Sequence, residues 1–169
     1  MAFSHPDYPE NKAERYEVFL AQTASLLDET LNPIANLANI AALMADALPQ
    51  INWCGFYLMD HGALTLGPFC GLPACTRIQP GRGVCGTAVQ KDRVLRIANV
   101  HDFPGHIACD SASQSEIVLP IRHQGRVIGV LDIDSPAPAR FDETDEQYLS
   151  ELVIQIQKAC SFDRASYTL

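Results

Sequence analysis

Residues 116–134 have the sequence EIVLPIRHQGRVIGVLDID, which predicts a β-hairpin. Two apolar runs rich in β-branched residues, 116–121 and 126–134, flank His123-Gln124-Gly125, and glycine beside polar residues is typical of a hairpin turn. We therefore expect two antiparallel strands that are joined at 123–125.

Acidic residues interrupt these apolar strands. Asp132 and Asp134 occupy alternate positions, so both side chains point to the same face, and Glu116 begins the neighbouring strand. The other strand residues divide in the same way: Ile128 and Val130 on the aspartate face, and Val127, Gly129, Leu131 and Ile133 on the opposite face. Either the acids mark solvated strand ends, or they form a cluster. A cluster would attract an ammonium group and, by like-charge repulsion, raise a carboxyl pKa enough to keep a proton for acid catalysis.

The segments before this hairpin alternate between helical and strand patterns. Apolar residues recur at helical spacing over 11–29, and again from the Asn32-Pro33 start to Pro49. Residues 52–59 and 63–69 predict a second hairpin, with its turn at 60–62. In the first of these strands Trp53, Gly55 and Tyr57 share one face, and Cys54, Phe56 and Leu58 share the other.

The remaining segments are shorter and more polar. We expect an irregular loop over 70–83, a short helix over 84–91, a strand over 94–98, and a long polar stretch over 99–114. Asp142 caps a final helix. This order predicts the α+β class: an antiparallel sheet with the N- and C-terminal helices packed on one face and a ligand pocket on the other.

Composition limits the function classes. The chain has 169 residues and a formal net charge of −8, which suits one acidic globular domain. Without a basic cluster, nucleic acid and anionic membranes are poor partners. No apolar run is long enough for a membrane span and the N-terminus shows no signal peptide, so we expect a cytoplasmic protein.

Six cysteines are present, and a reducing compartment argues against a disulfide framework. Cys54 and Cys160 lie on core-facing stripes and fit a structural role, whereas Cys70 is ambiguous. Cys75, Cys85 and Cys109 lie in or beside Gly- and Ser-rich loops near helix starts. Such positions are typical of thiols with a lowered pKa and redox or nucleophilic reactivity.

A zinc site is the alternative interpretation of the same thiols. His101, His106 and Cys109 are closely spaced, and Cys75 and Cys85 could join them. However, the chain has no C-x-x-C pair and no H-E-x-x-H run, and zinc ligands usually show tighter spacing. We therefore expect no metal and no organic cofactor.

Longer motifs add a resemblance. GPFCGLPACTRIQPGRGVCGTAVQ (67–90), VHDFPGHIACDSASQSEIVLPI (100–121), GVLDIDS (129–135) and NWCGFYL (52–58) resemble the free methionine-(R)-sulfoxide reductases, which are single-GAF-domain enzymes. The resemblance covers about residues 15–160, so it implies one GAF-like domain over 1–169. It also implies reduction of free methionine sulfoxide, regeneration by thioredoxin, and a homodimer as often found in the family.

The resemblance implies a role for each candidate residue. Cys109 matches the nucleophile, Cys75 the resolving thiol and Cys85 an auxiliary thiol. Glu116, Asp132 and Asp134 match the carboxylates that hold the ammonium and polarise the sulfoxide, with Glu116 and Asp134 expected to assist the oxygen. Trp53 and Tyr57 match the aromatic wall around the terminal methyl group, and backbone amides of 100–106 would bind the substrate carboxylate.

Two rival functions fit the same fold. A GAF domain also serves as a non-enzymatic sensor that binds cyclic nucleotides or other small ligands, since fold does not determine function. A zinc-binding structural or interaction protein is the second rival.

Overall fold

The computed structural model describes residues 6–106 and 110–162. Its elements follow the chain as α1 (Lys12–Leu26), α2 (Pro33–Ala47), β1 (Trp53–Asp60), β2 (Ala63–Cys70), β3 (Arg77–Ile78), α3 (Gly83–Lys91), β4 (Leu95–Ile97), the 3₁₀ turn η1 (Val100–Asp102), β5 (Ser115–His123), β6 (Arg126–Ser135) and α4 (Glu143–Ala159). The strands form one antiparallel sheet in the order β3-β2-β1-β6-β5-β4. The predicted α+β class is confirmed.

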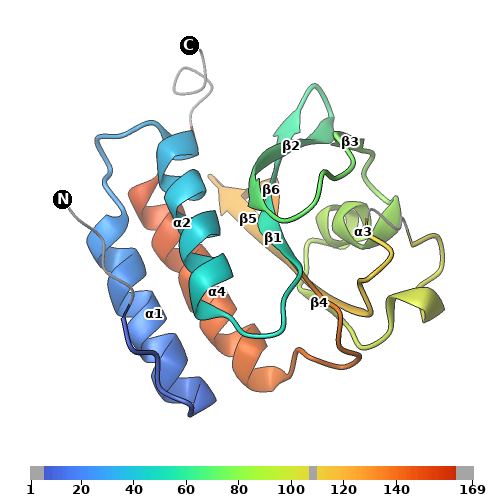
Figure 1. Cartoon of the computed structure of the whole chain (residues 1–169). Helices are drawn as coiled ribbons and strands as arrows, with labels where there is room; N and C mark the ends of the chain where they lie inside the picture. Colours follow the sequence, from blue (N-terminus) through green and yellow to red (C-terminus); the bar gives the residue numbers. More distant parts are fainter. Residues whose placement is uncertain (1–5, 107–109, 163–169) are drawn as a thin grey trace.

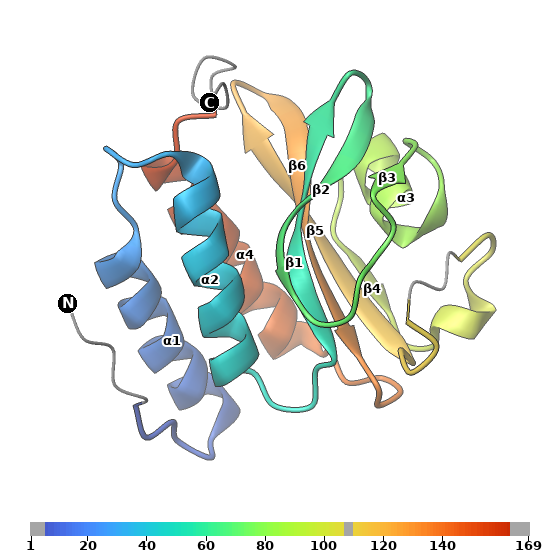
Figure 2. The same ribbon diagram turned by 45° about the horizontal axis from the view of Figure 1, so that its top comes forward.

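The two faces of the sheet carry different layers. Helices α1, α2 and α4 form one layer on one side of the sheet, and the short α3 lies on the other side (Figures 1 and 2). The layer of three helices covers an apolar core to which the sheet contributes Phe56, Ile117 and Leu131, all without solvent exposure. Helices on one face therefore leave the opposite face available for a site.

Polar side chains set the helix starts, as the sequence predicts for α2 and α4. Asn11 and Asn32 accept hydrogen bonds from backbone N–H groups at the starts of α1 and α2, and Pro33 is the first residue of α2. At α4, Asp142 accepts from the backbone of Asp145, whose side chain accepts from the backbone N–H of Asp142. This reciprocal cap satisfies donors that a helix start otherwise leaves unpaired.

Three local predictions were wrong. The 70–83 segment is not wholly irregular, because Arg77–Ile78 pairs with β2 as β3. The first helix ends at Leu26, not at 29. Ile128 does not share a face with Val130: Ile121 pairs with Gly129 and the next residue, Arg122, pairs with Val127, which leaves Ile128 as an extra residue packed against the helix-side core. A bulge shifts the alternation of a strand in this way.

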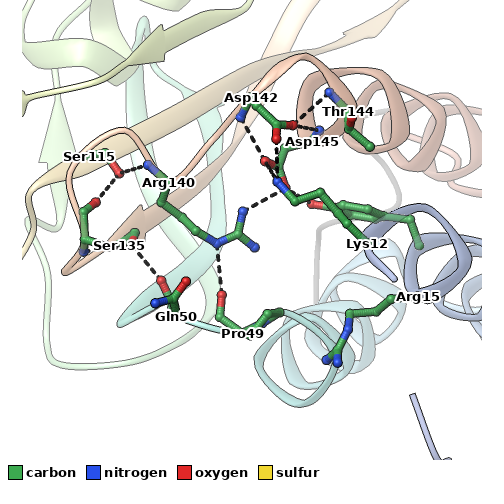
Figure 3. A network of polar contacts seen from close by, with 12 residues as sticks. Lys12, Arg15, Pro49, Gln50, Ser115, Ser135, Arg140, Asp142, Thr144 and Asp145 are labelled. Carbon is green, nitrogen blue, oxygen red and sulfur yellow. Dashed lines mark hydrogen bonds and ion pairs between the residues drawn. The ribbon is translucent and has the colours of Figure 1, made fainter. Parts of the chain in front are cut away.

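A buried ion pair joins the loop after β6 to the helical layer (Figure 3). Asp145 is fully buried, and its Oδ1 accepts from Arg140 Nη1 and from the Tyr16 hydroxyl, each at 2.8 Å. Lys12 Nζ donates to Asp145 Oδ2 at 2.8 Å. Burial and the adjacent Asp145 raise the pKa of Tyr16, so this hydroxyl stays a donor.

The same loop also contacts the strand ends. The backbone N–H of Arg140 donates to Ser115 Oγ at 3.3 Å, and its Nε donates to the Pro49 carbonyl at 3.1 Å. Ser135 Oγ donates to the Gln50 carbonyl at 2.6 Å (Figure 3). The ends of β5 and β6 are thereby connected to the segment that enters β1.

No helix in the described ranges has both the length and the apolar character that a membrane crossing requires.

Candidate functional site

Strand register brings the predicted acids together. Glu116 on β5 pairs with Asp134 on β6, and Asp134 pairs with Trp53 on β1. Two residues before Asp134 on β6, Asp132 lies opposite Gly55. Directly paired residues in adjacent strands point to the same face, so these side chains form neighbouring rows on the face away from α1, α2 and α4.

A cavity of about 40 Å³ opens over these rows. Its lining comes from β1, β3, β5 and β6, from α3 and the residue before it, from the loop around 72–74, and from three residues between η1 and β5: Trp53, Tyr57, Leu72, Pro73, Ala74, Ile78, Arg82, Gly83, Val84, Cys85, His106, Asp110, Ser113, Glu116, Asp132 and Asp134. The cavity therefore combines an acidic floor with an aromatic and apolar wall.

The three carboxyls are electrostatically perturbed, two of them being buried and Asp134 half-buried. Glu116 and Asp132 are each only 6% exposed. Burial, followed by the charges of the neighbouring aspartates, raises the pKa of Glu116 well above its ordinary value. Burial raises the pKa of Asp132 to about 6, and burial together with Asp132 raises that of Asp134. Raised carboxyl pKa values were predicted, but burial is a larger cause than like-charge repulsion.

Cys85 lies at this cluster on the first turn of α3. Its Sγ is 3.9 Å from Glu116 Oε1 and donates to it. Burial and the charges of Asp132 and Glu116 raise the pKa of Cys85 well above that of a free thiol. The expectation of a lowered pKa was therefore wrong for this residue, because burial beside acids outweighs the favourable position at a helix start.

The aromatic wall is a stack across β1 and β2. The rings of Trp53 and Tyr57 stack with centroids 5.9 Å apart, and Phe69 stacks on Trp53 at 5.4 Å. Trp53 Nε1 donates to the Leu72 carbonyl at 3.1 Å, which holds the indole in place. A Cβ on Gly55 would lie 2.4 Å from the Phe69 Cβ, so only glycine at this position lets Phe69 approach β1 this closely.

The sequence-based prediction missed three cavity residues, His106, Asp110 and Ser113, or assigned them another role, and it missed Asn52 beside them. Asn52 Nδ2 donates to Asp110 Oδ2 at 2.8 Å and to Ser113 Oγ at 3.0 Å, while Ser113 hydrogen bonds to Asp134. His106 Nε2 lies 3.9 Å from Glu116 Oε2, and burial lowers the pKa of His106. The NW pair at 52–53 was a signal for Asn52, but its partners are 58 and 61 residues away.

The other predicted thiols occupy different environments. Cys109 lies outside the described residues. Cys75 is half-buried and packs against the apolar cluster that contains Trp53 and Tyr57. Cys54 and Cys160 are buried in the helix-side core, as predicted, and Cys70 packs against that core at its edge. The structure thus separates Cys54 and Cys160 from the thiols near the cavity.

The zinc alternative predicted a different ligand set. Among the described residues, the group whose ligand atoms could share a metal ion consists of Cys85, Glu116 and Asp132, with these atoms all within 4.8 Å of one another. His101 is exposed on η1 and takes no part in this group.

Comparisons with known proteins agree with this geometry. The GAF domain model matches residues 23–160. The chain is 51% identical over 148 residues to the free methionine-R-sulfoxide reductase of Escherichia coli, covering 88% of this chain and 90% of that protein. It is 46% identical to the X-ray structure of free methionine-R-sulfoxide reductase from Neisseria meningitidis in complex with its substrate, with a TM-score of 0.87 over 92% of this chain and 95% of that one.

A third match is the Staphylococcus aureus fRMsr structure in its reduced form, 51% identical with a TM-score of 0.83, covering 85% of this chain and 94% of that one. The fold and the match over 23–160 define a GAF-domain protein. Within that class, the chain belongs to the free methionine-R-sulfoxide reductase family. Members of this family are thiol-dependent oxidoreductases.

Proposed function

We propose that this chain reduces free methionine-R-sulfoxide to methionine. The observation that carries the proposal is one cavity in which two buried carboxyls, Glu116 and Asp132, and the half-buried Asp134 lie beside the Trp53–Tyr57 stack. Such a cavity is suited to an amino acid with an ammonium group at one end and a small apolar group at the other. Relatives that are about half identical and bear this enzyme's name support it.

Recognition of the free amino acid follows from the acids. Asp132 Oδ1 is buried and, among the described residues, has no hydrogen-bond partner. An ammonium group would satisfy it and offset the repulsion between the carboxyls. Peptide-bound methionine sulfoxide lacks that ammonium group, so the carboxyls would remain unpaired at a cost of about 1–3 kcal/mol.

The raised pKa values support a role in sulfoxide activation. A sulfoxide oxygen is a poor leaving group unless it is protonated or strongly hydrogen bonded. Because burial raises the pKa of Glu116 and of Asp134, each holds its proton to a higher pH than an exposed carboxyl does, and the protonated form can donate to that oxygen. We assign this assistance to Glu116 and Asp134, and binding of the ammonium group to all three acids.

The redox steps rest on the family resemblance. The Cys109 sulfur attacks the substrate sulfur and takes its oxygen, which leaves methionine and a Cys109 sulfenic acid. Cys75 then condenses with the sulfenic acid to form a disulfide and releases water. The high pKa of Cys85 makes it a weak nucleophile, which supports an auxiliary role as a hydrogen-bond donor to Glu116.

Regeneration requires a dithiol, for which we propose thioredoxin, with exchange at the Cys75–Cys109 disulfide. A cytoplasmic location fits this requirement because reductants of this kind keep cytoplasmic thiols reduced. A homodimer, the absence of nucleic-acid and membrane partners, and a single domain over 1–169 stay predictions.

The decisive assay supplies racemic free methionine sulfoxide and a dithiol to the purified chain. We expect half of the racemate to be consumed and the other half to persist, with a peptide-bound sulfoxide left unchanged. No consumption, or equal consumption of the peptide, would refute the proposal. A Cys75→Ser variant should complete one turnover and accumulate sulfenic acid, whereas normal cycling would assign resolution to another thiol.

The sensor alternative has some support, since a structure from Burkholderia vietnamiensis described as a putative GAF sensor protein is 46% identical. An acidic cavity disfavours it, because the carboxylates would repel the phosphate of a cyclic nucleotide. Cys109→Ser separates the two functions: a reductase loses turnover, while a sensor keeps its ligand affinity. Metal analysis of the purified chain tests the alternative of a zinc-binding structural protein, and a chelator should not lower reductase activity.

A further inference from the structure

We propose that Cys85, Glu116 and Asp132 form an inhibitory binding site for Zn²⁺, beside which His106 lies. The ion is not a cofactor: it would occupy the place that the proposed function gives to the substrate ammonium, so ion and substrate exclude each other. The mutual exclusion rests on the proposed function, whereas the metal site itself does not.

The first support is the spacing of the ligand atoms. One atom from each of Cys85, Glu116 and Asp132 lies within 4.8 Å of the others. The Sγ of Cys85 and Oε1 of Glu116 are 3.9 Å apart. Tetrahedral zinc with its usual bond lengths of about 2.3 Å to sulfur and about 2.1 Å to oxygen separates two such ligands by about 3.6 Å. A small side-chain adjustment therefore suffices to close the site on an ion.

The second support is the histidine beside the cluster. His106 Nε2 lies 3.9 Å from Glu116 Oε2, and its side chain is largely buried at 14% exposure. Imidazole nitrogen, thiolate sulfur and carboxylate oxygen are the ligand types that zinc takes in proteins. Four residues of these types meet at one cavity, although no sequence motif groups them.

The third support is an unsatisfied acceptor. Asp132 is 94% buried, since only 6% of it is exposed, and its Oδ1 has no hydrogen-bond partner within the described ranges. No ion pair links Glu116, Asp132 or Asp134 to a lysine or arginine in the described part of the chain. A buried carboxyl cluster without a basic partner requires protons or a cation, and a divalent ion provides the larger compensation.

The thiol decides which cation binds. An all-oxygen site would suit Mg²⁺ or Ca²⁺, but a sulfur ligand favours softer ions such as Zn²⁺ and Co²⁺. Binding breaks the S–H bond of Cys85, and its proton passes to solvent as the sulfur–metal bond forms. No oxidation or reduction takes place, so the step needs no further reactant.

Cobalt provides a direct readout, because thiolate-to-Co²⁺ charge transfer absorbs in the near ultraviolet. The full chain is kept reduced with a phosphine, since dithiols would chelate the metal, and is titrated with Co²⁺ in the absence of substrate. We expect a charge-transfer band that saturates at one Co²⁺ ion per chain. Added Zn²⁺ should abolish this band because it displaces Co²⁺. Cys85→Ser should lose the band and Cys75→Ser, the matched control, should keep it.

The remaining measurements test the acids and the inhibition. Asp132→Asn should weaken Co²⁺ binding at least tenfold while its folding is checked by circular dichroism. With wild-type enzyme, buffered Zn²⁺ should raise KM and leave kcat unchanged. A band that survives Cys85→Ser, a band lost in Cys75→Ser, or no band in the wild-type chain would overturn the metal site. Because the cobalt titrations use no substrate, the test of the metal site does not depend on the reductase assay.

Discussion

The two faces of the central sheet use the same three strands, β1, β5 and β6, for opposite purposes. On the helix side, Phe56 and Leu131 are fully buried in an apolar core. On the cavity side, Glu116 and Asp132 are almost as deeply buried, yet they carry ionisable groups. Burial of apolar surface stabilises the fold, whereas burial of carboxyls opposes it. The comparison teaches that stability and function are divided between alternate residues of the same strands.

Removal of the Phe56 ring from the core between the sheet and the helices should give the largest effect on stability. Phe56→Ala leaves a cavity between β1 and the helices, and we expect the free energy of unfolding to fall by about 3–5 kcal/mol. Chemical denaturation measures this change. A loss below about 1 kcal/mol would mean that the helix-side core does not dominate stability, and the contrast between the faces would fail.

Neutralising a cavity-side acid should instead affect activity. Glu116→Gln removes a proton donor, and we expect kcat/KM for the free sulfoxide to fall roughly 10²–10³-fold. Stability should be unchanged or higher, because a buried carboxyl is replaced by a neutral amide. Steady-state kinetics and denaturation on the same variant give both values. Glu151→Gln, on the exposed side of α4, is the matched control and should behave like wild type.

The cavity face should make stability depend on pH. Asp132 has an ordinary pKa of 3.8 and a folded pKa of about 6, so between these values the unfolded chain binds fewer protons. Stability of the substrate-free chain should therefore fall as pH rises from about 4 to about 6, by roughly 2 kcal/mol. Glu116 and Asp134, whose pKa values are also raised, add to the fall. Denaturation curves across this range that show rising stability would contradict the raised pKa values.

The smallest effect concerns the aromatic wall. Trp53→Phe keeps a ring for stacking but loses the hydrogen bond to the Leu72 carbonyl. We expect a loss of about 0.5–1.5 kcal/mol in stability and a rise of only a few-fold in KM, with kcat unchanged. Thermal melts and kinetics test this. A fall in kcat as large as the rise in KM would contradict this. It would mean that the indole affects the reaction at sulfur and does not only position the aromatic wall.

Predictions from local pattern succeeded where neighbours in sequence decide the structure. Alternation placed Asp132 and Asp134 on one face, and turn chemistry placed the hairpin, although His123 still pairs in β5 and the turn is Gln124-Gly125. The same rule failed at Ile128, because a bulge depends on the partner strand. The Asn52–Asp110 contact was likewise not predictable, since nothing in either segment specifies that the other lies beside it.

The sequence by itself determined the α+β class, the two hairpins, the helix caps and the strand-face positions of the acids, because these depend on period and on residues close along the chain. Only the tertiary structure decided that Glu116, Asp132 and Asp134 share a cavity with Cys85 and His106, since that requires the register of three strands and the packing of α3. It also decided the direction in which their pKa values shift. Burial, which only the folded chain creates, raises the pKa of the acids and of the Cys85 thiol alike.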